Sequence, residues 1–133
     1  MGIARRMVES LVGSDTRAPK AVVERWPELA TIRLRRGGLP LRVGGWALGT
    51  RTVAAITLWR TVFVAPETEL DDELLLHELR HVHQFQESVL FPVRYLWESL
   101  LRGYRLNRFE ADARSYAAER LCSNAASQHP GDA

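Results

Sequence analysis

Residues 69–87 read ELDDELLLHELRHVHQFQE and have the pattern of an amphipathic helix. Apolar residues recur at intervals of four and three, at Leu75, Leu79 and Val82, as they do on one face of a helix. A Thr-x-x-Asp capping pattern at residues 68–71 precedes this run, and acidic residues fill the first turn, where the helix dipole favours negative charge. The sequence therefore predicts a helix over 69–87.

The centre of this helix carries the motif His77-Glu78-Leu79-Arg80-His81. Residues four apart lie one turn apart on the same helix face, so both imidazoles can reach one metal ion. Glu78 is adjacent to the first histidine and can reach a water at that ion without binding the metal itself. These five residues therefore supply two candidate metal ligands and a candidate general base.

A catalytic zinc site has a third protein ligand beside two such histidines. His83 follows His81 by two residues and lies on the other side of the helix, so we expect it to be a packed or solvated side chain. His129 belongs to a polar C-terminal segment that is expected to fray. The third ligand is therefore expected to be a carboxylate from a later helix.

Glu110 is the main candidate because it follows His81 by 29 residues, and a helix–turn–helix of that length can bring it back against the first helix. The alternative role for Glu110 is in a capping box with Asn107 at the start of its own helix. Asp112 and Glu119 are the other candidate ligands. Asp112 lies about 200° around the helix from Glu110, so it is expected to pair with an arginine or to orient a ligand histidine.

The rest of the chain predicts short strands followed by helices. β-Branched residues are frequent in 53–58 and 61–64, which form either one long strand or a hairpin that turns near Trp59 and Arg60. The other predicted elements are a helix over 1–13, a loop over 13–19, a helical turn over 20–29, strands over 31–35 and 39–43, and helices over 69–87, from Pro92 to Gly103 and over 107–121. The predicted class is α+β, with one zincin-like domain over 1–122 and a flexible tail over 123–133. In that domain an N-terminal mixed or antiparallel sheet precedes the active-site helix and two further helices.

The composition is typical of a globular protein and excludes several other classes. Of the 133 residues, 46% are hydrophobic, and four Trp, four Phe and three Tyr supply aromatic side chains for a core, which excludes a chain disordered throughout. A single cysteine, Cys122, excludes a disulfide-stapled scaffold. The sequence has no run of about 18 apolar residues and no secretory signal pattern. We therefore expect no membrane span and a cytoplasmic location.

Charge is distributed unevenly along the chain. Residues 1–66 carry eleven Lys and Arg against four Asp and Glu, and residues 67–133 carry seven against twelve. A basic face would suit a nucleic-acid binder, but arginines that alternate on a strand are typical of a solvated strand face, so no nucleic-acid partner is expected. The residues concerned are Arg33, Arg35, Arg36 and Arg42.

Two segments together, Leu74–Gln84 and Asn107–Ala113, resemble the gluzincin zinc metallopeptidases, in which HExxH is followed by a Glu on a downstream helix. The chain is similar to the minimal single-domain form of these enzymes and to short bacterial HExxH proteins, over residues 61–121 at most. The resemblance implies zinc as the cofactor and a peptide or protein as the substrate. It also implies that Glu78 is the catalytic base and that the zinc ligands are His77, His81 and Glu110.

The resemblance has further implications and one departure. It implies that strand 61–64 is an edge strand that pairs with an extended substrate; the alternative is a buried central strand. Many gluzincins have an Asp four residues after the ligand Glu that orients a zinc histidine, whereas here that position is Arg114 and the Asp is at 112. A further donor would stabilise the oxyanion of the reaction. The candidates are Tyr104, Tyr116, Asn107 and Arg114.

The sequence therefore predicts a zinc-dependent peptidase with Glu78 as general base. The alternative is a catalytically inactive zinc-binding interaction module, although a purely structural site does not require Glu78. The apolar segment 90–101 is expected to pack in the core, and otherwise to dock a partner or a second copy of the chain.

Overall fold

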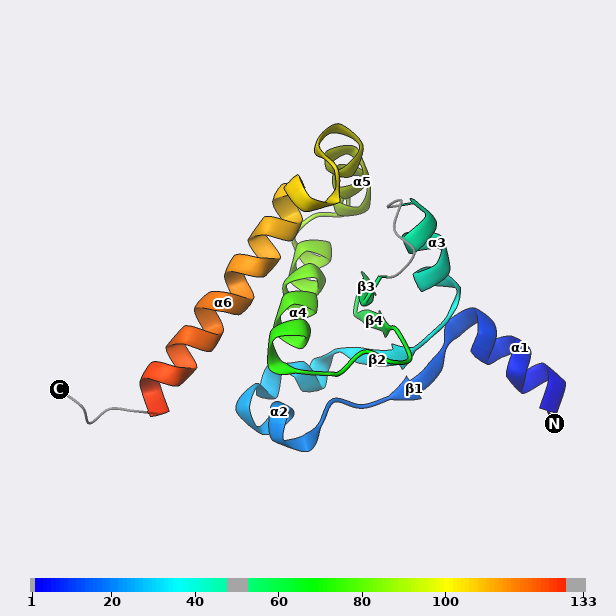
Figure 1. The fold of residues 1–133 in the computed structure, drawn as a ribbon, viewed down its shortest axis with the longest axis horizontal. Coiled ribbons are helices and arrows are strands. Elements are labelled where there is room, and N and C mark those ends of the chain that lie inside the picture. The colour runs from blue at the N-terminus through cyan, green and yellow to red at the C-terminus, as the bar shows by residue number, and fades with distance from the viewer. Residues whose placement is uncertain (1, 48–52, 129–133) are drawn as a thin grey trace.

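The computed structural model describes residues 2–47 and 53–128, and in this part of the chain four short strands form one sheet beside six α-helices (Figure 1). In chain order the elements are α1 (Gly2–Val12), β1 (Ser14–Thr16), α2 (Lys20–Arg25), the 3-10 helix η1 (Pro27–Thr31), β2 (Arg33–Arg36), α3 (Leu39–Ala47), β3 (Ala55–Leu58), β4 (Thr61–Val64), α4 (Asp72–Glu87), α5 (Phe91–Arg102), the 3-10 helix η2 (Tyr104–Leu106) and α6 (Arg108–Gln128). The predicted α+β class is confirmed, with the sheet strands preceding α4, α5 and α6.

The sheet is mixed, with strand order β1-β2-β4-β3. β2 and β4 are parallel, whereas β1 and β3 each run antiparallel to their neighbour. β3 and β4 form a hairpin rather than one long strand, and its turn contains Trp59 at a φ of 54°. The prediction that strand 61–64 is an edge strand is wrong. β4 lies between β2 and β3, with Val62 and Val64 fully buried, and among the described strands β3 is at that edge of the sheet.

The segment predicted as a strand over 39–43 is instead the start of α3. Pro40 lies in the first turn of this helix, where a missing N–H costs no intrahelical hydrogen bond. Gly44 lies inside this helix, where the absence of a side chain leaves room for close packing against Ile56 of β3. A Cβ atom at position 44 would lie 1.8 Å from Cδ1 of Ile56.

The segment predicted as a loop over 13–19 contains the short strand β1, which arginine side chains help to fix. Arg35 donates to the carboxylate of Asp15 and to the carbonyl oxygens of Val12 and Gly13. Arg36 donates in the same way to three carbonyl oxygens in the segment 65–68. Two of the four arginines considered for nucleic-acid binding therefore stabilise the fold itself.

α4 lies between the sheet and α6 (Figure 1). It begins three residues later than predicted, because Asp71 rather than Thr68 is the N-cap: its carboxylate accepts a hydrogen bond from Leu74 N at 2.8 Å. The core forms between α4, the sheet, α2 and η1, and several of its side chains are almost fully buried. These are Leu75, Leu76, Leu79, Val62 and Val64.

α5 does not fill the core as its composition predicted. Only Phe91 and Glu98 are buried among its residues, and most of its large apolar side chains are exposed. Phe91, the first residue of α5, is the apolar side chain that packs inward, against the rings of Phe85 and Phe109. None of the described helices has the length and apolar composition needed to cross a membrane.

α6 extends beyond the predicted end at residue 121 and is helical through residues 123–128 of the expected tail. Alanines at 125 and 126 favour the helical state, and Ser127 Oγ donates to the carbonyl of Ser123 one turn earlier, at 2.9 Å. Residues 129–133, including His129, lie outside the described part of the chain.

Truncation of a core leucine tests this packing. Leu75→Ala is expected to lower the free energy of unfolding by about 2–5 kcal/mol, because the side chain is 0% exposed and its removal leaves a cavity. Leu100→Ala, at a position 81% exposed, is the matched control and is expected to change it by less than about 0.5 kcal/mol. Urea denaturation measures both, and equal effects of the two substitutions would contradict the described core.

Candidate metal centre

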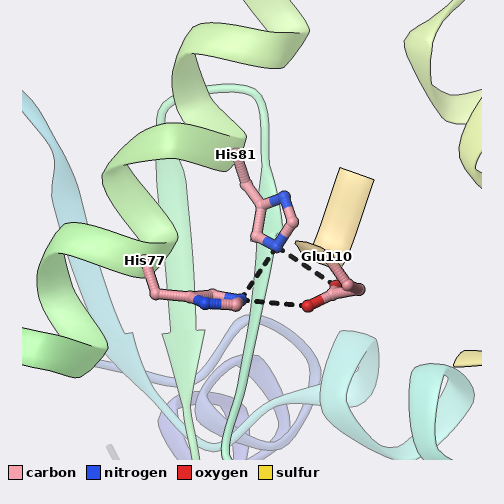
Figure 2. Close-up of side chains that lie close together, drawn as sticks. All are labelled: His77, His81 and Glu110. Atoms are coloured by element: carbon pink, nitrogen blue, oxygen red, sulfur yellow. Dashed lines mark hydrogen bonds and ion pairs between the residues drawn. The ribbon is translucent and has the colours of Figure 1, made fainter. Parts of the chain in front are cut away.

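The structure brings together three of the side chains that the sequence nominated as ligands (Figure 2). His77 and His81 project from α4, and Glu110 reaches them from the first turn of α6. The two Nε2 atoms are 3.2 Å apart. Glu110 directs Oε2 to His77 Nε2 at 3.0 Å and Oε1 to His81 Nε2 at 3.1 Å. Two segments 29 residues apart in sequence therefore converge on one point.

The spacing and chemistry of these donors fit zinc. Ligand atoms about 2.0–2.1 Å from a tetrahedral zinc ion lie about 3.3 Å from one another. Here the two Nε2 atoms are 3.2 Å apart, and each lies 3.0 or 3.1 Å from one of the two carboxylate oxygens of Glu110. Two imidazole nitrogens and a carboxylate are also a donor set found in catalytic zinc sites, where they leave a fourth position open. The side chains are preorganised, since Glu110 is 3% and His81 is 6% exposed.

The electrostatics of the cluster favour a bound cation. Burial acts to raise the pKa of Glu110, but hydrogen bonds to His77 and His81 outweigh it and hold that pKa well below its ordinary value. Burial acts to lower the pKa of His81, yet Glu110 and the charge of Glu78 raise it to about 9. The Glu110 carboxylate therefore keeps its negative charge, and the His81 imidazole lies where positive charge is stabilised.

Gln84 fixes the orientation of His81. The amide nitrogen of Gln84 donates to the carbonyl oxygen of Phe109 at 3.1 Å and to Asp112 Oδ2 at 2.9 Å. The amide oxygen therefore faces His81, and Nδ1–H of that ring donates to it at 2.7 Å. With the proton on Nδ1, Nε2 presents its lone pair to the cluster, which is the tautomer that a metal ligand needs.

Asp112 does not bind a ligand histidine directly; it binds Gln84, which in turn binds His81. It accepts from Gln84 and from Arg80 Nε at 2.6 Å, so it pairs with an arginine, as predicted for one of its two roles. Glu119 and His83 lie away from the cluster. Glu119 is exposed on α6, and the ring of His83 packs edge-on against Tyr116 at a centroid distance of 5.7 Å.

Glu110 is held in place by a neighbour on α5 and is not engaged in a capping box. Tyr95 donates its hydroxyl to Glu110 Oε1 at 2.6 Å, and burial together with the charge of Glu110 raises the pKa of Tyr95 well above its ordinary value. Asn107 caps α6 by itself, since its Oδ1 accepts from Phe109 N at 2.9 Å. The amide nitrogen of Asn107 donates to the carbonyl of Tyr95 at 3.1 Å, which ties the start of α6 to α5.

Glu78 lies in a cleft beside the cluster. Its Oε2 accepts a 2.7 Å hydrogen bond from the hydroxyl of Thr57 on the edge strand β3. Among the described residues no hydrogen bond engages Oε1, which stays available to a water or a substrate. The cleft consists of two adjoining hollows of about 220 and 400 Å³, and both are lined by Ala55, Glu78 and Tyr104.

Three residues of the centre were not predicted from the sequence: Gln84, Tyr95 and Thr57. Gln84 lies three residues after His81, one turn along the same helix, so its spacing carried a usable signal. Tyr95 and Thr57 reach the site only through tertiary packing, and nothing in their local sequence distinguishes them from core or strand residues.

A substitution at Gln84 tests its positioning role. Gln84→Ala is expected to lower zinc affinity about 10–100-fold, the usual effect of removing a partner that orients a ligand histidine. Gln86→Ala, an exposed position on the same helix, is the matched control and is expected to leave affinity unchanged. Competition with a chromophoric chelator measures both, and unaltered affinity in Gln84→Ala would show that this hydrogen bond does not tune the site.

Comparison of the chain with models of protein families, with curated proteins and with solved structures finds no match. The function proposed below therefore depends on the geometry of this site. The main features of the site are the preorganised cluster of two histidines and one glutamate, and the hydrogen-bonded Glu78 in the adjoining cleft.

Proposed function

We propose that the protein is a zinc-dependent peptidase in which His77, His81 and Glu110 hold the metal and Glu78 is the general base. The observation that carries this proposal is the position of Glu78 in a cleft next to the three-donor cluster, with one carboxylate oxygen bound by Thr57 and the other available. An inactive zinc-binding module has no need for a carboxylate held in this way.

When bound, zinc would supply Lewis-acid chemistry, polarising a carbonyl and making water more acidic. Glu78 accepts the proton of the attacking water and later passes it to the amine that leaves. Thr57 restricts the rotation of the Glu78 carboxylate through its hydrogen bond to Oε2, so the reactive oxygen keeps one direction. His77, His81 and Glu110 keep the metal beside Glu78 because α4 and α6 are packed together.

The edge strand β3 is the proposed binding surface for the substrate backbone, in place of β4. All four of its residues, 55–58, line the 220 Å³ hollow that also contains Glu78, His81 and Glu110. An extended peptide can pair with an open strand edge through main-chain hydrogen bonds, which bind many sequences with little selectivity. We therefore propose a peptide or an unfolded protein segment as the substrate.

Tyr104 is the best of the four candidates for stabilising the oxyanion. It lines both hollows of the cleft. Burial, together with the charges of Glu110 and Glu78, raises the pKa of Tyr104 to about 12, so its hydroxyl stays protonated and able to donate. Arg114 lines only the larger hollow, Tyr116 packs against His83, and Asn107 is fully buried as a cap.

The test is cleavage of a mixture of unstructured peptides by the zinc-loaded protein, followed by mass spectrometry. We expect new termini to appear with zinc, to be absent after chelation, and to return when zinc is restored. Zinc bound at one site without any cleavage would favour the inactive interaction module. The proposed location is the cytoplasm, where the single exposed thiol of Cys122 remains reduced.

A further inference from the structure

α5 has an inverted amphipathic arrangement. Its buried face carries the carboxylate of Glu98, which is 6% exposed, and the hydroxyl of Tyr95, which binds Glu110. Its apolar side chains point to solvent and form a stripe along the helix and the turn before it, the α5 stripe. Its members are Val89, Leu90, Val93, Leu96, Trp97, Leu100 and Leu101, which are between 54% and 96% exposed.

The α5 stripe is bordered by positive charge. Arg94, Arg102 and Arg105 are all exposed on α5 or in the turn that follows it. Glu98 is the one acidic residue between Ser88 and Phe109, and it is buried. Its carboxylate forms ion pairs with Arg102 at 3.5 Å and with Arg108 at 3.3 Å. Glu98 therefore offsets the charge of Arg102, whereas no ion pair among the described residues engages Arg94 or Arg105.

We propose that the α5 stripe docks the protein on an anionic lipid surface. An amphipathic helix with arginines beside apolar residues lies in the plane of a membrane interface, with its apolar side chains below the headgroups. Trp97, 62% exposed in the middle of the stripe, has the amphipathic ring that is enriched at that depth. α5 has 12 residues and no described helix can cross a membrane, so this contact is peripheral.

Charge distinguishes this occupant from a second copy of the chain. A two-fold dimer through the α5 stripe would place the positively charged border of one chain near that of the other, which is unfavourable. An anionic headgroup layer instead attracts the arginines of this border, and each basic residue near the surface raises the binding affinity about fivefold. Leu96 belongs to the stripe and also lines the 220 Å³ hollow, so docking would hold the cleft beside the lipid surface.

The test is flotation of the full chain with vesicles made of equal parts of phosphatidylglycerol and phosphatidylcholine, compared with phosphatidylcholine alone. We expect binding to the anionic vesicles only, and a decrease as salt is raised. Trp97→Glu should weaken binding at least about tenfold, and Arg94→Ala and Arg105→Ala about fivefold each. We expect the tryptophan fluorescence of the natural chain to shift to the blue on binding, whereas Trp97→Phe should still bind without that shift.

Met7→Glu is the matched control, because Met7 is an apolar residue of α1 that is 63% exposed, close to the 62% of Trp97. It should leave binding unchanged, and thermal unfolding of both variants should match the natural chain. The proposal is overturned if the natural chain fails to float with anionic vesicles, or if Met7→Glu weakens binding as much as Trp97→Glu. It is equally overturned if sedimentation shows a dimer that Trp97→Glu dissociates while vesicles do not bind.

Discussion

Glu78→Gln is expected to reduce the rate of peptide cleavage by about 10²–10⁴-fold, the usual contribution of a positioned general base. The amide that replaces the carboxylate has nearly the same shape, and its oxygen can still accept the hydrogen bond from Thr57. The lost capacity is proton transfer, since an amide does not accept a proton at neutral pH. Initial rates on a peptide identified in the cleavage mixture measure this effect.

Zinc content separates a catalytic loss from a binding loss in this variant. Glu78 is not among the three donors that surround the candidate metal position, so the zinc content of Glu78→Gln should equal that of the natural chain. Glu73→Gln is a matched control, because Glu73 is exposed on the same helix and lines the larger hollow. Cleavage by Glu78→Gln at the natural rate would exclude Glu78 as the general base.

Glu110→Ala is expected to weaken zinc binding by more than about 100-fold, because it removes a direct ligand. Removal of a residue that only orients a ligand costs at most roughly 100-fold. The substitution deletes both oxygens that approach the histidines, at 3.0 and 3.1 Å, and leaves two imidazoles alone on one helix. Tyr95 also loses the acceptor of its hydroxyl. Competition with a chromophoric chelator measures the affinity, and circular dichroism checks that α6 remains folded.

Two variants on the same helix calibrate that result. Glu119→Ala removes an exposed carboxylate from α6 and should bind zinc as the natural chain does. Asp112→Asn weakens the hold on Gln84 and should fall between the two. If Glu110→Ala retained full zinc affinity, the third ligand would have to be another residue, and the convergence of Glu110 with the histidines would have no role in metal binding.

Those features of the site that depend on helical spacing were predictable from sequence. Residues four apart, such as His77 and His81, lie on the same face of any helix. The apolar repeat of residues 69–87 predicted α4 itself. The expectation that His83 lies on the other side of the helix follows from the same spacing, and the structure packs its ring against Tyr116. Glu110 was predictable as a candidate from chain length, but only the tertiary structure decides between its position by the histidines and a capping box.

Features that depend on how elements pair were not predictable. A strand of β-branched residues such as 61–64 fits both an edge and a central position, and its pairing with β2 depends on a parallel contact between distant segments. The strand predicted over 39–43 is the start of a helix that continues through Gly44, and the local sequence does not show that this glycine makes room for Ile56. The apolar residues of α5 predicted a core helix, but most of them are exposed. Hydrophobicity alone does not reveal which face of a helix the rest of the protein covers.

The central claim is that this chain holds one zinc ion between α4 and α6. Native mass spectrometry of protein loaded with zinc and then dialysed tests it most directly. We predict one zinc per chain for the natural sequence and none for the double variant His77→Ala, His81→Ala. A natural chain without zinc, or a double variant that keeps the same zinc content, would contradict the account.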